Sequence, residues 1–150
     1  MTAEKFIWIV LIAGIIGTTG MTGFLEAITK SGIANADMVR AVGSLFTKSL
    51  ESSFKVGIIV DILAGIIFAA FYTFVIVSFE IHGLLNCIGA CMLTGFIHGA
   101  VVSFLLVATV AEHHPLKQFQ KAGFSVAIAH WAGHIFYGFL VGLIIGLMGI

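Results

Sequence analysis

Apolar residues dominate four long stretches of the chain, and polar residues gather in the short connections between them. Each stretch can supply the roughly 20 mostly apolar residues that a membrane-spanning helix needs. The stretches cover about residues 6–28, 54–79, 84–110 and 122–149. This pattern predicts an all-α integral membrane protein, with residues 1–150 forming one domain, a bundle of four transmembrane helices. We expect the first stretch to be a permanent span, because it lacks the basic leader and small-residue cleavage site of a signal peptide.

The connection at 29–53 carries a helical pattern of its own within the segment ADMVRAVGSLFTKSLESS. Its apolar residues recur at helical spacing, at Met38, Val42, Leu45 and Phe46. The pattern predicts a short amphipathic helix between the first two transmembrane helices. Such a helix either lies in the membrane interface or caps the bundle through contacts with protein, and the sequence leaves both open.

The connection at 111–121 contains Pro115, which makes an uninterrupted helix unfavourable there and predicts a loop. We expect the neighbouring His113 and His114 to be solvated on that loop.

Composition supports the membrane class: 60% of the residues are hydrophobic, 9% are charged, and the mean hydropathy is +1.17. The formal net charge of zero gives no reason to expect nucleic acid as a partner. With four spans, the connections at 29–53 and 111–121 lie on one side of the membrane, and both termini lie on the other. Most basic residues are on the side of these two connections: Lys30, Arg40, Lys48, Lys55, Lys117 and Lys121. Only Lys5 belongs to the other side, so the positive-inside rule predicts cytoplasmic connections and both termini outside.

A four-residue spacing of small or polar residues recurs in every span. The four series are Gly14, Thr18, Thr22 and Glu26; Gly57, Asp61, Gly65, Ala69 and Thr73; Cys87, Cys91, Gly95 and Gly99; and His130, His134, Gly138, Gly142 and Gly146. Residues four apart share one face of a helix, and small residues there let helices approach closely in lipid. We expect these faces to meet inside the bundle, mainly for packing.

Packing does not explain four ionisable residues within the spans: Asp61, His98, His130 and His134. Ionisable groups in the hydrocarbon are costly and normally face the bundle interior or a water-filled cavity. Counted from the cytoplasmic ends, His98 and His134 lie at one depth and Asp61 and His130 at another. We therefore expect a polar ladder that descends into the bundle from the cytoplasmic face, below Glu26.

Several kinds of chemistry fit this cluster. His130 and His134 lie one helical turn apart and, with His98 and Asp61, could bind zinc, copper or iron. His98 and His134 at equal depth could also be the axial ligands of a b-type haem, although close glycine packing argues against a large planar group. An Asp61–histidine proton or ion relay is a third interpretation, although the outer half carries no matching ladder.

The remaining interpretation is a hydrogen-bonded interior that only fixes helix register, with about 0.6–2 kcal/mol per interhelical bond. The sequence leaves these alternatives open. It contains no phosphate-binding loop, dinucleotide fingerprint, nucleophile elbow or zincin helix, so we predict no catalytic residues and do not expect a self-contained enzyme.

The chain resembles the uncharacterised YagU-like four-span inner-membrane proteins. The resemblance rests on the first-span segment IAGIIGTTGMTG, the segment DMVRAVGSLF, and the pattern H-x-x-x-H-x-x-Y-G-x-x-x-G from His130 to Gly142. It implies a bacterial or archaeal protein of the cytoplasmic membrane with no assigned activity.

From its size and lack of enzyme motifs we predict a binding or accessory subunit of a larger membrane assembly or homo-oligomer. It would hold a metal or haem through its intramembrane histidines. A small oligomeric channel or transporter is the alternative.

Overall fold

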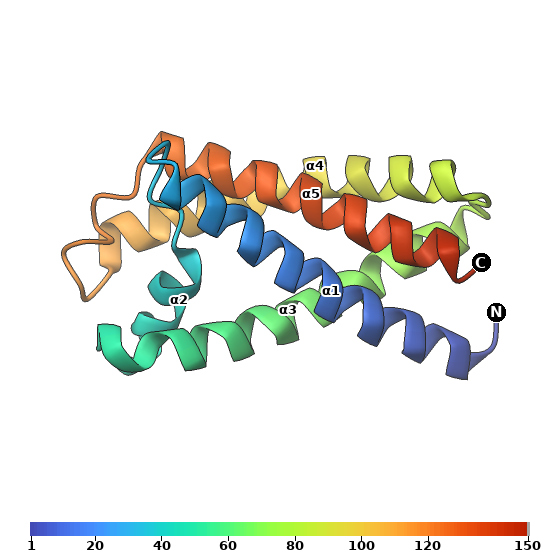
Figure 1. The fold of residues 1–150 in the computed structure, drawn as a ribbon, viewed down its shortest axis with the longest axis horizontal. Coiled ribbons are helices and arrows are strands. Elements are labelled where there is room, and N and C mark those ends of the chain that lie inside the picture. The colour runs from blue at the N-terminus through green and yellow to red at the C-terminus, as the bar shows by residue number, and fades with distance from the viewer. Residues whose placement is uncertain (150) are drawn as a thin grey trace.

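A computed structural model describes residues 1–149, which form five α-helices and the turns between them (Figure 1). The helices are α1 (Ala3–Lys30), α2 (Met38–Thr47), α3 (Leu50–Ser78), α4 (Leu84–His113) and α5 (Phe124–Leu147). Within residues 1–149, four of them, α1, α3, α4 and α5, are long and apolar enough to cross a membrane. The predicted all-α fold, with four candidate spans and a short helix between the first two, is confirmed.

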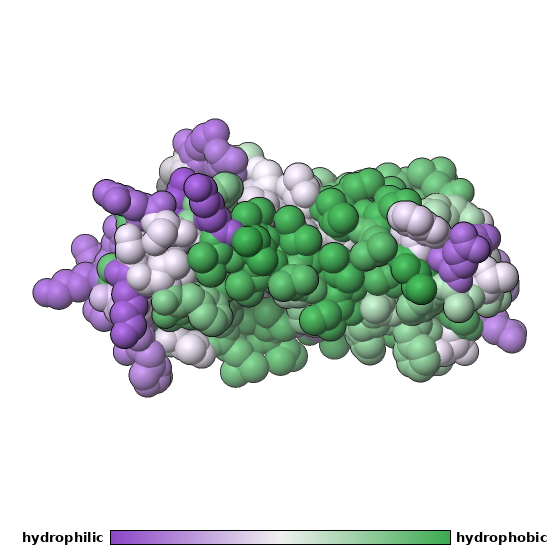
Figure 2. Space-filling view, turned by 90° about the horizontal axis from the view of Figure 1, so that it is seen from below, coloured by the Kyte–Doolittle hydropathy of each residue, from purple (hydrophilic) through white to green (hydrophobic). Residues whose placement is uncertain are grey.

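The connections alternate between the two ends of the molecule. Both termini and the α3–α4 turn lie at one end, whereas α2 and the α4–α5 loop lie at the other (Figure 1). An apolar belt separates two more polar ends in the space-filling view (Figure 2). This distribution matches a bilayer, in which apolar side chains face lipid and polar ones lie near the headgroups.

The short helix α2 ends earlier than the sequence pattern suggests. Lys48 adopts a left-handed conformation (φ 53°) that terminates α2, and α3 begins two residues later at Leu50. Residues 50–53 therefore belong to the second span. Gly43 of α2 packs on the backbone of Ser53, and Gly57 of α3 packs on that of Val39, so α2 is held against the bundle by close backbone contact.

Helices α4 and α5 pack through the small residues that the sequence singled out. Gly95 lies against the backbone of His134, and Gly138 lies against the backbone of Cys91. A methyl group added to Gly142 would lie 2.6 Å from the carbonyl oxygen of Cys87. The expectation that these faces meet is confirmed, because the residues at four-residue spacing on one helix contact those on the other.

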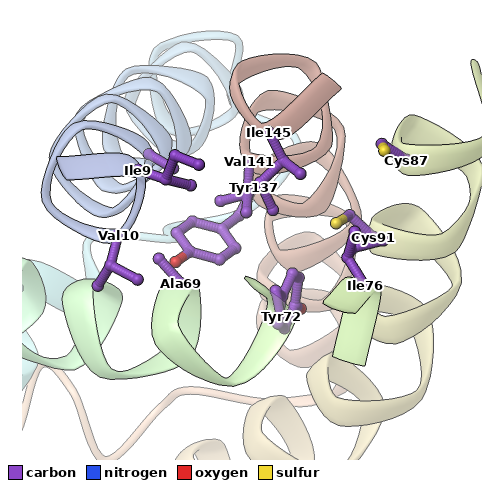
Figure 3. Packing of buried hydrophobic residues seen from close by; sticks show 11 residues of the cluster. Ile9, Val10, Ala69, Tyr72, Ile76, Cys87, Cys91, Tyr137, Val141 and Ile145 are labelled. Atoms are coloured by element: carbon purple, nitrogen blue, oxygen red, sulfur yellow. The ribbon is translucent and has the colours of Figure 1, made fainter. Parts of the chain in front are cut away.

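Helix α1 joins this pair to α3. Gly14 packs on Ile66, Gly65 packs on Thr18, and Gly17 faces the ring of Tyr137. An apolar core from α1, α3, α4 and α5 fills the bundle toward the end with the termini, with members that include Ile9, Ile76, Cys91, Val141 and Ile145 (Figure 3). Apolar side chains therefore fill the interior of that half.

Helix α3 diverges from α4 and α5 toward the opposite end, where α2 fills part of the space between them (Figure 1). Contacts of α3 are extensive with α1 and α2 and sparse with α4 and α5. The bundle is thus tightly packed at one end and looser at the other, and the intramembrane polar residues lie on the looser side.

Candidate functional site: an intramembrane polar cavity

The site is a cavity of about 190 Å³ that lies between α3 on one side and α1, α4 and α5 on the other, with α2 contributing Val42. Its polar lining residues are Thr18, Thr22, Asp61, His130, His134 and Tyr137. Apolar side chains that include Leu25, Val60, Phe68, Val102 and Leu106 complete the wall. The structure therefore brings three of the four predicted site residues, Asp61, His130 and His134, around one space.

Three of the lining side chains are buried and carry polar atoms without a hydrogen-bond partner. Thr18 is 6% exposed, and His130 and His134 are each 7% exposed. Within residues 1–149, Thr18 Oγ1, His130 Nδ1 and His134 Nε2 have no hydrogen-bond partner. Buried polar atoms are normally paired, and each unpaired one costs about 1–3 kcal/mol. The three residues line one cavity, so a polar occupant of that cavity would lie next to them.

Asp61 brings a carboxyl group to the same cavity from α3, where it is half-buried. The acidic partners of the ion pairs among residues 1–149 are Glu26, Asp37 and Glu112. Asp61 is not among them, and no Lys or Arg lines the cavity. A carboxylate at this depth is costly unless something supplies the opposite charge or a proton.

His98, the fourth predicted site residue, lies beside the cavity and does not line it. Its Nδ1 is 2.7 Å from the Tyr72 hydroxyl, and its ring lies 4.1 Å from that of Phe68. The ring centroids of His98 and His134 are 4.6 Å apart in an edge-on contact, and those of His134 and His130 are 4.9 Å apart. This contact shows that the two imidazoles lie side by side, while their equal depth in the membrane stays a prediction.

The predicted cofactor chemistry gains no support from this geometry. Within residues 1–149, no three His, Cys, Asp or Glu side chains are arranged to hold a metal ion. A haem between two axial imidazoles would need them on opposite sides of the macrocycle, whereas the His98 and His134 rings touch. Metal binding by Asp61, His98, His130 and His134, and haem binding by His98 and His134, stay predictions.

Two tyrosines that the sequence did not place at the site shape its inner end. The Tyr137 hydroxyl donates to the Gly65 carbonyl of α3 at 2.6 Å, and its ring packs on that of Tyr72 with centroids 5.6 Å apart. The ring lies between α5 and α3 near Ala69 (Figure 3). Tyr137 thereby separates the cavity from the apolar core. Its only sequence signal is a hydroxyl-bearing aromatic within an apolar span, which does not reveal its partner.

A second, more polar pocket adjoins the cavity on the side of α2. Thr22 and Leu25 line both pockets. The charged residues of the outer pocket are paired with one another, Lys30 with Glu26 and Arg40 with Asp37, each at 2.7 Å. The polar series that the sequence placed below Glu26 thus follows α1 inward through Thr22 to Thr18.

One expectation about the 111–121 loop is wrong. His113 is exposed, but His114 is 1% exposed, so it is not a solvated loop residue. Its Nε2 lies 2.9 Å from the Ala41 carbonyl oxygen of α2, and its Nδ1 accepts the Leu116 backbone N–H at 3.0 Å. The Phe119 ring packs against the His114 ring, with centroids 4.7 Å apart. The turn at Pro115 folds the imidazole back onto α2, and the sequence alone did not indicate this long-range contact.

Comparisons with known proteins add no family to this description. No protein-family model, no curated protein and no solved structure matches the chain. The four candidate spans of the YagU-like resemblance are present within residues 1–149, while the family itself stays a prediction from the sequence. What the geometry establishes is a small multi-span membrane protein with a cavity of mixed polar and apolar lining between its candidate spans.

Proposed function

We propose that this protein binds a small polar or amphiphilic ligand inside the membrane, in the cavity that Asp61, His130 and His134 line. The observation that carries the proposal is that three buried residues with unpaired polar atoms, Thr18, His130 and His134, line one space. A hydrogen-bonded interior that only fixes helix register would pair these atoms with each other or with the backbone. A ligand with its own polar group satisfies them instead.

Binding accounts for the site better than conduction does. The polar series on α1 stops at Thr18, and the apolar core with Ile9, Val141 and Ile145 follows toward the end with the termini. A channel or transporter would need a polar path through that half, where apolar side chains fill the core. We therefore propose ligand binding first and keep passage of protons or ions as the alternative.

We further propose that the protein acts as a subunit of a larger membrane assembly or of a homo-oligomer, in the cytoplasmic membrane of a bacterium or archaeon. Helix α3 supports this, because its apolar face is exposed along its length at Ile59, Leu63, Ile67, Phe71 and Phe74. This face meets lipid or the helices of other subunits.

Native mass spectrometry of the full chain in lipid nanodiscs tests the binding proposal. We expect a stoichiometric small-molecule adduct on the wild-type protein, lost in Thr18→Val and His130→Leu. Ser103→Ala is the matched control, because Ser103 is also fully buried with an unpaired hydroxyl but lies outside the cavity lining. That variant keeps the adduct. Elemental analysis of the same sample shows whether the adduct contains a metal.

A wild-type protein that carries no adduct, or an adduct that all three variants retain, would count against the cavity as the binding site. Conductance in liposomes that Asp61→Asn abolishes would favour the channel alternative.

A further inference from the structure

We propose that the ligand of this cavity is a small organic ammonium ion with one apolar group. The inference rests on the proposed binding function and deepens it by assigning the chemical class of the ligand. It follows from the charge, the hydrogen-bonding groups and the apolar walls of the site.

The charge around the cavity calls for a cation. Asp61 contributes a carboxyl group, and the lining contains neither Lys nor Arg. The basic groups of the neighbouring pocket are already engaged, since Lys30 pairs with Glu26 and Arg40 pairs with Asp37. A carboxylate within the hydrocarbon is stabilised by a paired cation, so a cationic ligand supplies what the described part of the chain does not.

The unpaired polar atoms suit an ammonium group as hydrogen-bond donor. A carboxylate oxygen accepts, a threonine hydroxyl can accept, and the free nitrogen of a neutral imidazole accepts in one of its two tautomers. Asp61, Thr18 and His130 therefore form a set of acceptors on three different helices. An anion would find no formal positive charge among the residues that line this space.

The remaining wall suits the apolar part of such a ligand. Phe68 and Tyr137 are aromatic, and aromatic rings attract organic cations. Leu25, Val60 and Leu106 are aliphatic. Cavities of about 150 Å³ lined by apolar side chains bind benzene, so a space of about 190 Å³ accommodates one ring with a short polar group.

The test is isothermal titration of the full chain in nanodiscs with benzylammonium chloride, with the uncharged benzyl alcohol and the anionic benzoate as probes of similar shape. Heats measured with empty nanodiscs are subtracted. We expect benzylammonium to bind more tightly than either comparator. Asp61→Asn should weaken benzylammonium binding by about tenfold or more, as expected for loss of a charge-assisted hydrogen bond, and should weaken benzyl alcohol binding by a smaller factor.

Glu51→Gln is the matched control, because it neutralises a carboxylate of the same helix that is exposed in the first turn of α3. It should bind benzylammonium as the wild type does. A circular dichroism spectrum and a thermal unfolding midpoint of Asp61→Asn that match those of the wild type show that this variant is folded.

The outcomes separate the two proposals. If benzoate or benzyl alcohol binds as tightly as benzylammonium, or if Asp61→Asn has no effect, the cavity binds ligands but the ammonium assignment is overturned. If none of the three probes binds and native mass spectrometry finds no adduct, both proposals fail.

Discussion

Gly142 of α5 lies directly against the backbone of α4, where a side chain of any size would separate the two helices. Its added methyl group would meet the Cys87 carbonyl oxygen at 2.6 Å and the Ile88 Cα at 2.7 Å. Both are backbone atoms, so the contact cannot be relieved by a change of rotamer. The small residues on this face therefore set the distance between α4 and α5, and with it the position of His134 beside His98.

Gly142→Ala should lower the free energy of unfolding by about 1–3 kcal/mol, because overpacking forces the helix backbones apart. Unfolding by a denaturing detergent, followed by circular dichroism, measures the change. Gly89→Ala is the control: Gly89 lies on α4, and an added methyl group there meets nothing within 4 Å. Equal stability losses in the two variants would show that close packing is not the cause.

The Tyr137 hydroxyl bonds the Gly65 carbonyl oxygen across two spans, so Tyr137→Phe removes one interhelical hydrogen bond and keeps the ring. We expect the free energy of unfolding to fall by about 0.6–2 kcal/mol in the same assay. Thr109→Val is the comparison, because the Thr109 hydroxyl bonds only Leu105 of its own helix. A Tyr137→Phe protein as stable as the wild type would contradict a stabilising role for this bond.

Among the elements, α2 depends on a contact from a distant loop. The Nε2 atom of His114 lies 2.9 Å from the Ala41 carbonyl oxygen of α2 and 3.2 Å from the Ser44 hydroxyl. Because Nδ1 accepts the Leu116 N–H, the proton of the neutral ring belongs on Nε2, where it faces the Ala41 carbonyl oxygen. The α4–α5 loop thereby holds α2 over the cavity, which Val42 lines.

His114→Ala should loosen α2 without unfolding the spans. We expect faster hydrogen–deuterium exchange of the amides of Met38–Thr47, with unchanged exchange in the middle of α4 and α5, because the lost contacts join α2 to the α4–α5 loop and do not involve the middle of the spans. His113→Ala removes an exposed histidine one residue away and should leave exchange as in the wild type. Identical exchange profiles for the two variants would contradict the role of His114.

The long elements were predictable from the sequence because hydropathy and helix length are local properties. Each span of the structure starts and ends near the predicted bounds, and the four-residue spacing correctly placed Gly138 and Gly142 against α4. Asp61 and His130, which the sequence predicts at one depth, both line the cavity.

Other features of the site needed the three-dimensional arrangement. The divergence of α3 from α4, the role of Phe68 in the cavity wall and the burial of His114 depend on contacts between distant segments. No local pattern of residue types encodes those contacts. His98 illustrates the limit, since its place on a helix face near His134 was predictable but its hydrogen bond to Tyr72 was not.

At the scale of the whole molecule, basic residues gather at the end that carries α2 and the α4–α5 loop. They include Lys30, Arg40, Lys48, Lys55, Lys117 and Lys121, whereas Lys5 lies at the other end. The positive-inside rule predicts that the first end is cytoplasmic, and the outer pocket would then open toward that side.

Cysteine labelling checks this orientation. Starting from a protein with Cys87 and Cys91 replaced by alanine, single cysteines are introduced at the exposed positions Glu4 and Lys121. In intact bacterial cells, a membrane-impermeant maleimide should label Glu4→Cys, and Lys121→Cys should react only after permeabilisation. The reverse pattern would show that both termini are cytoplasmic.

The sparse contact between α3 and its chain neighbour α4 has a consequence for biosynthesis. Helix α1 packs on both α3 and α5, so the fold closes only after the last span has been inserted. Until then Asp61 lies in a three-helix or four-helix intermediate that lacks His130 and His134. A membrane insertase or a bound lipid headgroup that shields this carboxyl group during synthesis would lower the free-energy cost of the intermediate that forms before α5 is inserted.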